Sequence, residues 1–139
     1  MHALRPTNAA GLAVRAAIVG LTLATGWIHA TLGGPLFTLN AAGYLVAAVA
    51  MVVPLRVAIR FRWLIRLGLI GYAATAIVAW YLTGPRYDVA YLAKAIEIGL
   101  IALLLVEVWA YDGNPLARIR RALRPTMRVR DRRPSGARA

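Results

Sequence analysis

The chain has 139 residues, of which 60% are hydrophobic, and its formal net charge is +12 because 17 Lys and Arg stand against five Asp and Glu. A soluble domain of this length has too much surface to hide so many apolar side chains, whereas a bilayer takes up the apolar part and leaves the charges at its edges. The composition therefore argues against a soluble globular enzyme, a disordered chain and, since there is no cysteine, a disulfide scaffold.

Four apolar windows follow one another along the chain. They cover about residues 13–32, 35–55, 63–82 and 89–110. A hydrocarbon core about 30 Å thick needs about 20 such residues in a helix. The windows are continuous and do not alternate strictly, so they predict helices and not barrel strands. We expect a membrane domain over residues 1–111 and a basic tail over residues 112–139.

The connections between these windows are short. Gly33 and Gly34 end the first predicted helix, and Pro35 suits the first turn of the second, where its missing N–H costs nothing. Pro54 is expected to kink or end the second helix. The third connection, at residues 84–88, is a turn by composition. Short links predict an all-α, up-down-up-down four-helix bundle.

The positive residues are distributed unevenly about the predicted spans. Fifteen of the 17 fall on one side of a four-span arrangement, and only Arg86 and Lys94 belong to the other side. The positive-inside rule then places both termini in the cytoplasm. We therefore expect a multi-pass protein of the bacterial cytoplasmic (inner) membrane.

The predicted tail carries nine Arg between Arg118 and Arg138. Basic residues beside a membrane are attracted to anionic headgroups by about 1 kcal/mol each. We expect the tail to lie against such headgroups, with docking on an acidic protein partner as the alternative. Nucleic-acid binding is not expected, because the tail has neither a recognition motif nor interleaved aromatic residues.

Polar side chains interrupt the spans at a common depth in the predicted outer half of the bilayer. Lys94 and Glu97 lie one turn apart on one helix face, roughly 8 and 12 Å below the helix end, and Glu97 is too deep to reach water. Glu107, by contrast, is near the inner end and is expected to reach the interface. The candidate ligand or proton pocket comprises His29, Asn40, Tyr44, Thr75, Trp80, Lys94 and Glu97.

This set of polar residues has two interpretations. In the first, Lys94 and Glu97 form a structural ion pair, and His29 and Asn40 join the helices by hydrogen bonds. In the second, the set forms an outward-facing pocket for a proton, a small ligand or a lipid headgroup, since ionisable residues within a membrane are usually functional. No catalytic residue, cofactor or metal site is predicted, because His29 and Glu97 are too few ligands for a metal and no catalytic motif occurs.

Two stretches carry a resemblance to known proteins. Residues 28–44, IHATLGGPLFTLNAAGY, and residues 91–97, YLAKAIE, resemble stretches of small four-span bacterial membrane proteins of unknown function. The resemblance covers about residues 13–111 and leaves out the tail. It implies the four-span fold and no activity.

Three functional hypotheses follow from the sequence. The leading one is a non-enzymatic accessory or stabilising subunit of a larger membrane assembly, because the chain is small, has minimal loops and ends in a basic tail. Such a subunit contacts other membrane subunits or a second copy of itself. The alternatives are a bundle that handles a ligand, a lipid or protons through the outer pocket, and a small membrane enzyme.

Overall fold

The computed structural model describes residues 8–54 and 56–112. In this part of the chain every regular element is a helix, and no strand occurs. The elements are α1 (Ala9–Leu32), α2 (Pro35–Val52), α3 (Arg56–Arg60), α4 (Arg62–Thr83), α5 (Asp88–Glu107) and the π-helical turn η1 (Val108–Asp112). The expected basic tail falls on residues 112–139, and all of it beyond Asp112 lies outside the described residues.

Four of the helices are long and apolar enough to cross a membrane. They are α1, α2, α4 and the continuous segment Asp88–Tyr111 formed by α5 and most of η1. The second link, expected to be only a connection, contains the five-residue helix α3. The four long helices indicate a multi-pass membrane protein.

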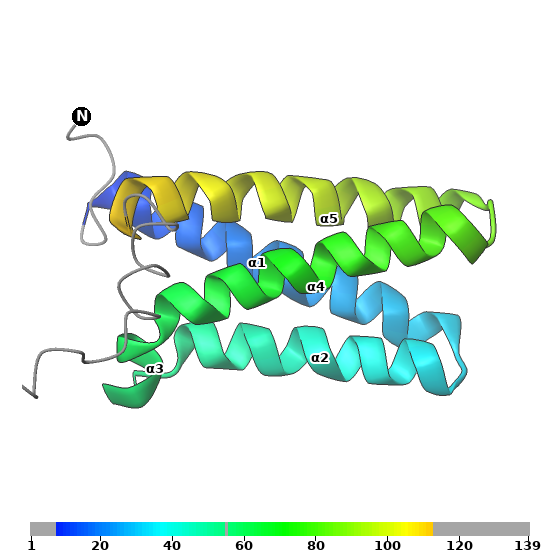
Figure 1. Ribbon diagram of the computed structural model, residues 1–139, viewed down its shortest axis with the longest axis horizontal. Coiled ribbons are helices and arrows are strands. Elements are labelled where there is room, and N and C mark those ends of the chain that lie inside the picture. Colours follow the sequence, from blue (N-terminus) through cyan, green and yellow to red (C-terminus); the bar gives the residue numbers. More distant parts are fainter. Residues whose placement is uncertain (1–7, 55, 113–139) are drawn as a thin grey trace, which may run out of the picture.

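The four long helices lie side by side (Figure 1). Helix α1 packs against α2 and α5, and α4 packs against α5 and α2. The α1–α2 and α4–α5 connections lie at one end of the bundle, which we name the link end. The opposite end, where α3 lies, is named the α3 end.

The helix ends are set by residues that the sequence analysis singled out. Gly33 and Gly34 have φ values of 71° and 87°, a left-handed region that favours glycine, and Pro35 opens α2 directly after them. Helix α2 ends at Val52, three residues before the predicted limit. Val53 is extended (ψ 127°), as expected for a residue before proline, so Pro54 lies just beyond the helix.

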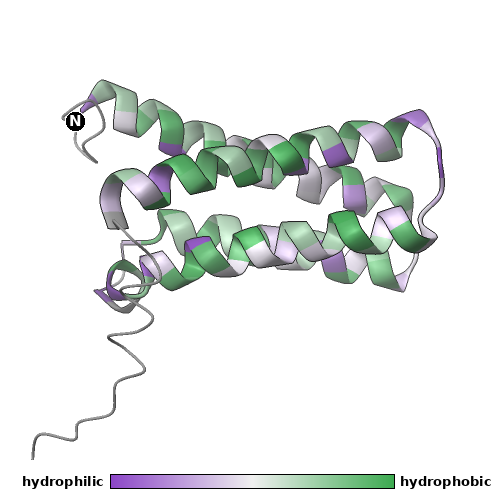
Figure 2. Ribbon diagram, turned by 45° about the horizontal axis from the view of Figure 1, so that its top comes forward, coloured by the Kyte–Doolittle hydropathy of each residue, from purple (hydrophilic) through white to green (hydrophobic). Residues whose placement is uncertain are grey.

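The interior of the bundle is narrow, and most apolar side chains point outward. The buried core is formed by Ile18, Tyr44, Met51, Leu69, Leu100 and Leu104. Along α5 the buried positions alternate at spacings of three and four residues, so one stripe of the helix faces inward. Figure 2 shows hydrophobic residues along all four helices and isolated hydrophilic positions among them. An outward apolar surface of this kind suits contact with lipid.

Helices α1 and α2 approach each other closely at Gly26. A Cβ at this position would lie 3.2 Å from the Cβ of Tyr44 and 3.6 Å from the carbonyl oxygen of Ala41. Without a hydrophobic drive between helices in lipid, close packing of this kind stabilises the bundle.

Substituting Gly26→Ala is expected to destabilise the bundle by about 1–2 kcal/mol, because the added methyl group pushes Tyr44 away from α1. The matched control is Gly20→Ala on the same helix, where a Cβ meets nothing within 4 Å. Unfolding by sodium dodecyl sulfate in mixed micelles measures both. Equal stability of the two variants would contradict the close approach at Gly26.

Candidate functional site

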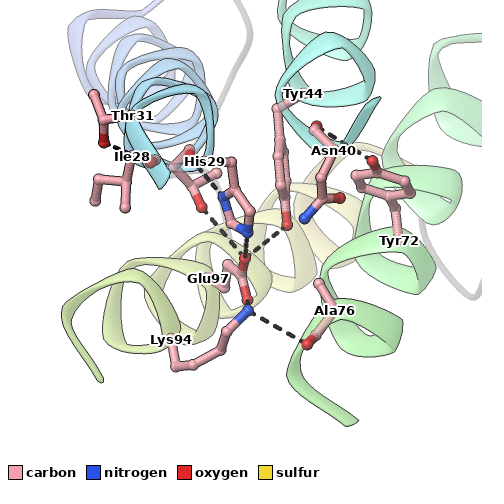
Figure 3. Close-up of polar contacts among 10 residues, drawn as sticks. Ile28, His29, Thr31, Asn40, Tyr44, Tyr72, Ala76, Lys94 and Glu97 are labelled. Carbon is pink, nitrogen blue, oxygen red and sulfur yellow. Dashed lines mark hydrogen bonds and ion pairs between the residues drawn. The ribbon is translucent and has the colours of Figure 1, made fainter. Parts of the chain in front are cut away.

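The Glu97 carboxylate is the centre of a polar cluster that joins three helices (Figure 3). Glu97, on α5, is fully buried. Its Oε1 accepts hydrogen bonds from the Tyr44 hydroxyl of α2 at 3.0 Å and from the Thr25 hydroxyl of α1 at 3.3 Å. We name Thr25, His29, Tyr44, Lys94 and Glu97 the Glu97 cluster.

Lys94 supplies the positive charge of this cluster and connects it to the fourth long helix. Its ammonium donates to Glu97 Oε2 at 2.6 Å and to the backbone carbonyl of Ala76, on α4, at 3.3 Å. The ammonium carries three N–H donors, and these two contacts use two of them. All four long helices therefore meet at one buried ion pair.

His29 approaches the same carboxylate from α1. Its Nδ1 donates to the carbonyl oxygen of Thr25 at 2.7 Å, because a carbonyl can only accept, and this fixes the ring orientation. The other ring nitrogen, Nε2, lies 3.7 Å from Glu97 Oε1. The Nε2 atom of His29 therefore faces the same carboxylate oxygen that the hydroxyls of Thr25 and Tyr44 bond.

A partly open cavity of about 340 Å³ lies next to this cluster at the link end. Its wall is mainly apolar and includes Leu36, Phe37 and Ala76, while His29 and Lys94 are on the polar side. Lys94 is only 7% exposed, so it lines the cavity from a nearly buried position. Ligand cavities of about 300–1,000 Å³ with an apolar wall and few polar groups are typical of small-molecule sites.

Asn40, Thr75 and Trp80 also line the cavity, and the polar side-chain atoms of Thr75 and Trp80 are bonded to backbone carbonyls of their own segment. The Thr75 hydroxyl donates to the carbonyl of Gly71, and the Trp80 indole N–H donates to the carbonyl of Pro85. Asn40 lies on the wall, and its backbone carbonyl accepts from the Tyr72 hydroxyl at 3.2 Å. Thr75 and Trp80 therefore shape the cavity, Asn40 adds a polar side chain to its wall, and the Glu97 cluster provides its charge.

Thr25 is a member of the cluster that the sequence analysis missed. Its signal was present, since Thr22, Thr25, Gly26 and His29 recur at helical spacing and are all buried on one face of α1. Threonine is common on exposed helix surfaces as well, where it bonds to its own helix, as Thr31 does to the carbonyl of Ile28. The sequence alone does not distinguish a threonine that faces the interior of the bundle from one on its outer surface.

The expectation for Glu107 was wrong. The residue was expected to reach the membrane interface, yet it is fully buried. Its Oε2 accepts from Arg66 Nε of α4 at 2.8 Å, and its Oε1 lies 3.4 Å from Arg15 Nη2 of α1. Two arginines that the sequence analysis counted only as topology signals thus turn inward and hold this carboxylate. We name Arg15, Arg66 and Glu107 the Glu107 cluster.

An apolar section separates the two clusters. Glu97 and Glu107 are ten residues apart on α5, which corresponds to about 15 Å along the axis. Leu100 and Leu104 lie between them, fully buried, and pack with Ile18 and Met51. Thr22 is buried in this section, but its hydroxyl donates to the carbonyl of Ile18 on its own helix, and no hydrogen bond within the described residues joins the two carboxylates, which counts against a continuous proton path through the bundle.

Other kinds of site find no support in the described residues. Within that part of the chain, no three His, Cys, Asp or Glu side chains are grouped so that they would hold a metal ion.

Comparison with known proteins finds no matching family model, no matching curated protein and no matching solved structure.

Proposed function

We propose that the chain is a four-span protein of the bacterial cytoplasmic membrane with up-down-up-down topology and both termini in the cytoplasm. The charge distribution supports this orientation, since basic residues of the described helices concentrate at the α3 end, which then faces the cytoplasm. Those at the α3 end are Arg15, Arg56, Arg60, Arg62 and Arg66, against Arg86 and Lys94 toward the link end.

The function that the geometry supports best is binding of a small, mainly apolar molecule in the cavity at the link end. The observation that carries this proposal is the placement of Lys94 at an otherwise mostly apolar wall. Lys94 has one N–H donor beyond its two contacts within the described residues, and that donor fits a hydrogen-bond acceptor on the ligand.

Charge balance favours a neutral acceptor on this ligand. Lys94 and Glu97 already neutralise each other at 2.6 Å. A carboxylate in the cavity would add a second buried negative charge, which is costly in a low-dielectric site. An ester or ketone carbonyl accepts the lysine hydrogen without that cost. The class of ligand is therefore a small apolar molecule, or a short acyl chain, with a carbonyl group.

Trp80 provides a direct probe of cavity occupancy, because it lines the wall. The other three tryptophans are replaced by phenylalanine, so that only Trp80 fluoresces. Methyl octanoate is expected to change this fluorescence in a saturable way, and the octanoate anion is expected to bind at least about tenfold more weakly. Equal binding of ester and anion would contradict the charge argument.

Filling the cavity is expected to abolish ester binding. In Ala76→Phe the new ring occupies the cavity, so the affinity for methyl octanoate should fall by at least about tenfold. The control is Ala102→Phe, at an exposed position of α5, which should bind as the parent protein does. Identical fluorescence responses in both variants would show that the ester only partitions into the detergent and would overturn the proposal.

A second candidate is the accessory or stabilising subunit of a larger membrane assembly. It is favoured by the surroundings of Glu97. This residue is fully buried and both of its carboxylate oxygens are bonded, as expected of a structural ion pair. Purification at native abundance in a mild detergent tests it. An unassociated monomer would contradict this role, whereas ester binding with no associated subunit would favour the first.

A further inference from the structure

Three arginine side chains lie near one buried carboxylate at the α3 end of the bundle. Arg15 and Arg66 share one carboxylate, that of Glu107. Arg62, one turn before Arg66 on α4, lies within electrostatic range of Arg15, Arg66 and Glu107. Arg62 therefore adds a positive charge to a region where Arg15 and Arg66 already share one carboxylate.

Several hydrogen-bond donors in this region have no acceptor among the described residues. The Nε atoms of Arg15 and Arg62 and the hydroxyl of Tyr111 are buried and make no hydrogen bond there. Tyr111 belongs to this group because its ring lies 5.7 Å from the guanidinium of Arg66. Buried donors without acceptors cost about 1–3 kcal/mol each, and more when they are charged. Charge and hydrogen bonding thus both favour an anion with several acceptor oxygens.

We propose that Arg15, Arg62 and Tyr111 bind a phosphate group at the α3 end, next to the Arg66–Glu107 ion pair. A phosphate has several acceptor oxygens and a negative charge, so it can accept two parallel N–H bonds from one guanidinium group. Arg66 takes no direct part, because Glu107 holds its Nε, and together they position the site. The site lies at the opposite end of the bundle from the cavity and does not depend on it.

A lipid headgroup is the source that the surroundings favour. Trp109 is 72% exposed two residues after Glu107, and Phe61 is 45% exposed one residue before Arg62. Exposed aromatic residues at a span end mark the headgroup level of a membrane. Basic sites between spanning helices at this level bind the headgroups of anionic lipids. Free phosphate has the same chemistry, and the experiment separates the two.

The test compares two single-charge variants of the full chain. Arg62→Gln removes a proposed ligand, and Arg60→Gln removes an exposed arginine two residues away, whose guanidinium lies over the Phe61 ring. Both variants keep the basic tail, so general attraction to anionic lipid changes equally. Native mass spectrometry from neutral detergent measures bound phosphatidylglycerol, phosphatidylcholine and inorganic phosphate.

The parent protein and Arg60→Gln are expected to retain one phosphatidylglycerol, and Arg62→Gln to bind it about tenfold more weakly. Retention of inorganic phosphate without lipid, lost in Arg62→Gln, would support the site with free phosphate as its source. If Arg62→Gln does not fold, Arg62→Lys keeps the charge without the fork and is expected to bind more weakly than Arg60→Gln. Equal binding by the Arg62 and Arg60 variants, for both lipid and phosphate, would overturn the proposal.

Discussion

Replacing Glu97 by glutamine is expected to destabilise the bundle by about 3–5 kcal/mol, because the change leaves the Lys94 ammonium buried without a counter-charge. The glutamine side chain has nearly the same shape as that of Glu97, so packing around Tyr44 is retained. The loss is measured as the free energy of unfolding in mixed micelles titrated with sodium dodecyl sulfate. Asp88→Asn removes an exposed carboxylate from the first turn of the same helix and is expected to have little effect.

The double variant Lys94→Met/Glu97→Gln separates the charge from the packing. Since neither buried charge remains, it is expected to recover more than half of the stability lost in Glu97→Gln alone. A double variant no more stable than Glu97→Gln would contradict the assignment of the cost to the unpaired ammonium. The hydrogen bonds of Thr25 and Tyr44 would then account for the loss.

Replacing Glu107 by glutamine is the second change with a large expected effect. Arg66, which is only 4% exposed, would lose its ion pair with the Glu107 carboxylate, and Arg15 would lose its contact as well. Arg15 is a quarter exposed and recovers hydration, so we expect a loss of about 3 kcal/mol, at the low end for a broken buried pair. The same unfolding measurement applies.

A matched comparison for Glu107→Gln is Arg56→Gln, which removes an exposed charge at the same end of the bundle. It is expected to be nearly neutral, as surface charges usually are. A loss in Glu107→Gln as small as that in Arg56→Gln would mean that water or headgroups reach Arg66, and the burial of the Glu107 cluster would be contradicted.

The sequence predicted the number of long apolar helices because span length and hydropathy are local properties of the chain. It also predicted that a turn at Gly33 and Gly34 separates the first two, and the positive φ values there agree. The helix α3 was missed because five residues between charged positions carry no distinct pattern. The observed helix ends differ from the predicted limits by a few residues. Helix α2, for example, ends at Val52 because Val53, which precedes Pro54, is extended.

The residues proposed from depth along each span include four of the five members of the Glu97 cluster, because a charge far from water must find a partner inside the bundle. Depth along the span gave the wrong environment for Glu107, because a carboxylate near a span end is stabilised either by water at the interface or by a buried arginine. That choice depends on which residues of α1 and α4 face α5. The cavity likewise depends on how four helices pack, and no local pattern predicts its volume.

Helix α5 carries both buried carboxylates, about 15 Å apart, and each one bonds to a different set of neighbours. Because no hydrophobic drive joins helices in lipid, apolar contacts alone fix the axial position of a helix less strongly than a buried ion pair does. Sliding α5 by one turn would separate Glu97 from Tyr44 and Glu107 from Arg66 at once. The contacts of Glu97 and Glu107 together fix both the rotation and the axial position of α5, so these polar residues specify a single register of the helix in the bundle.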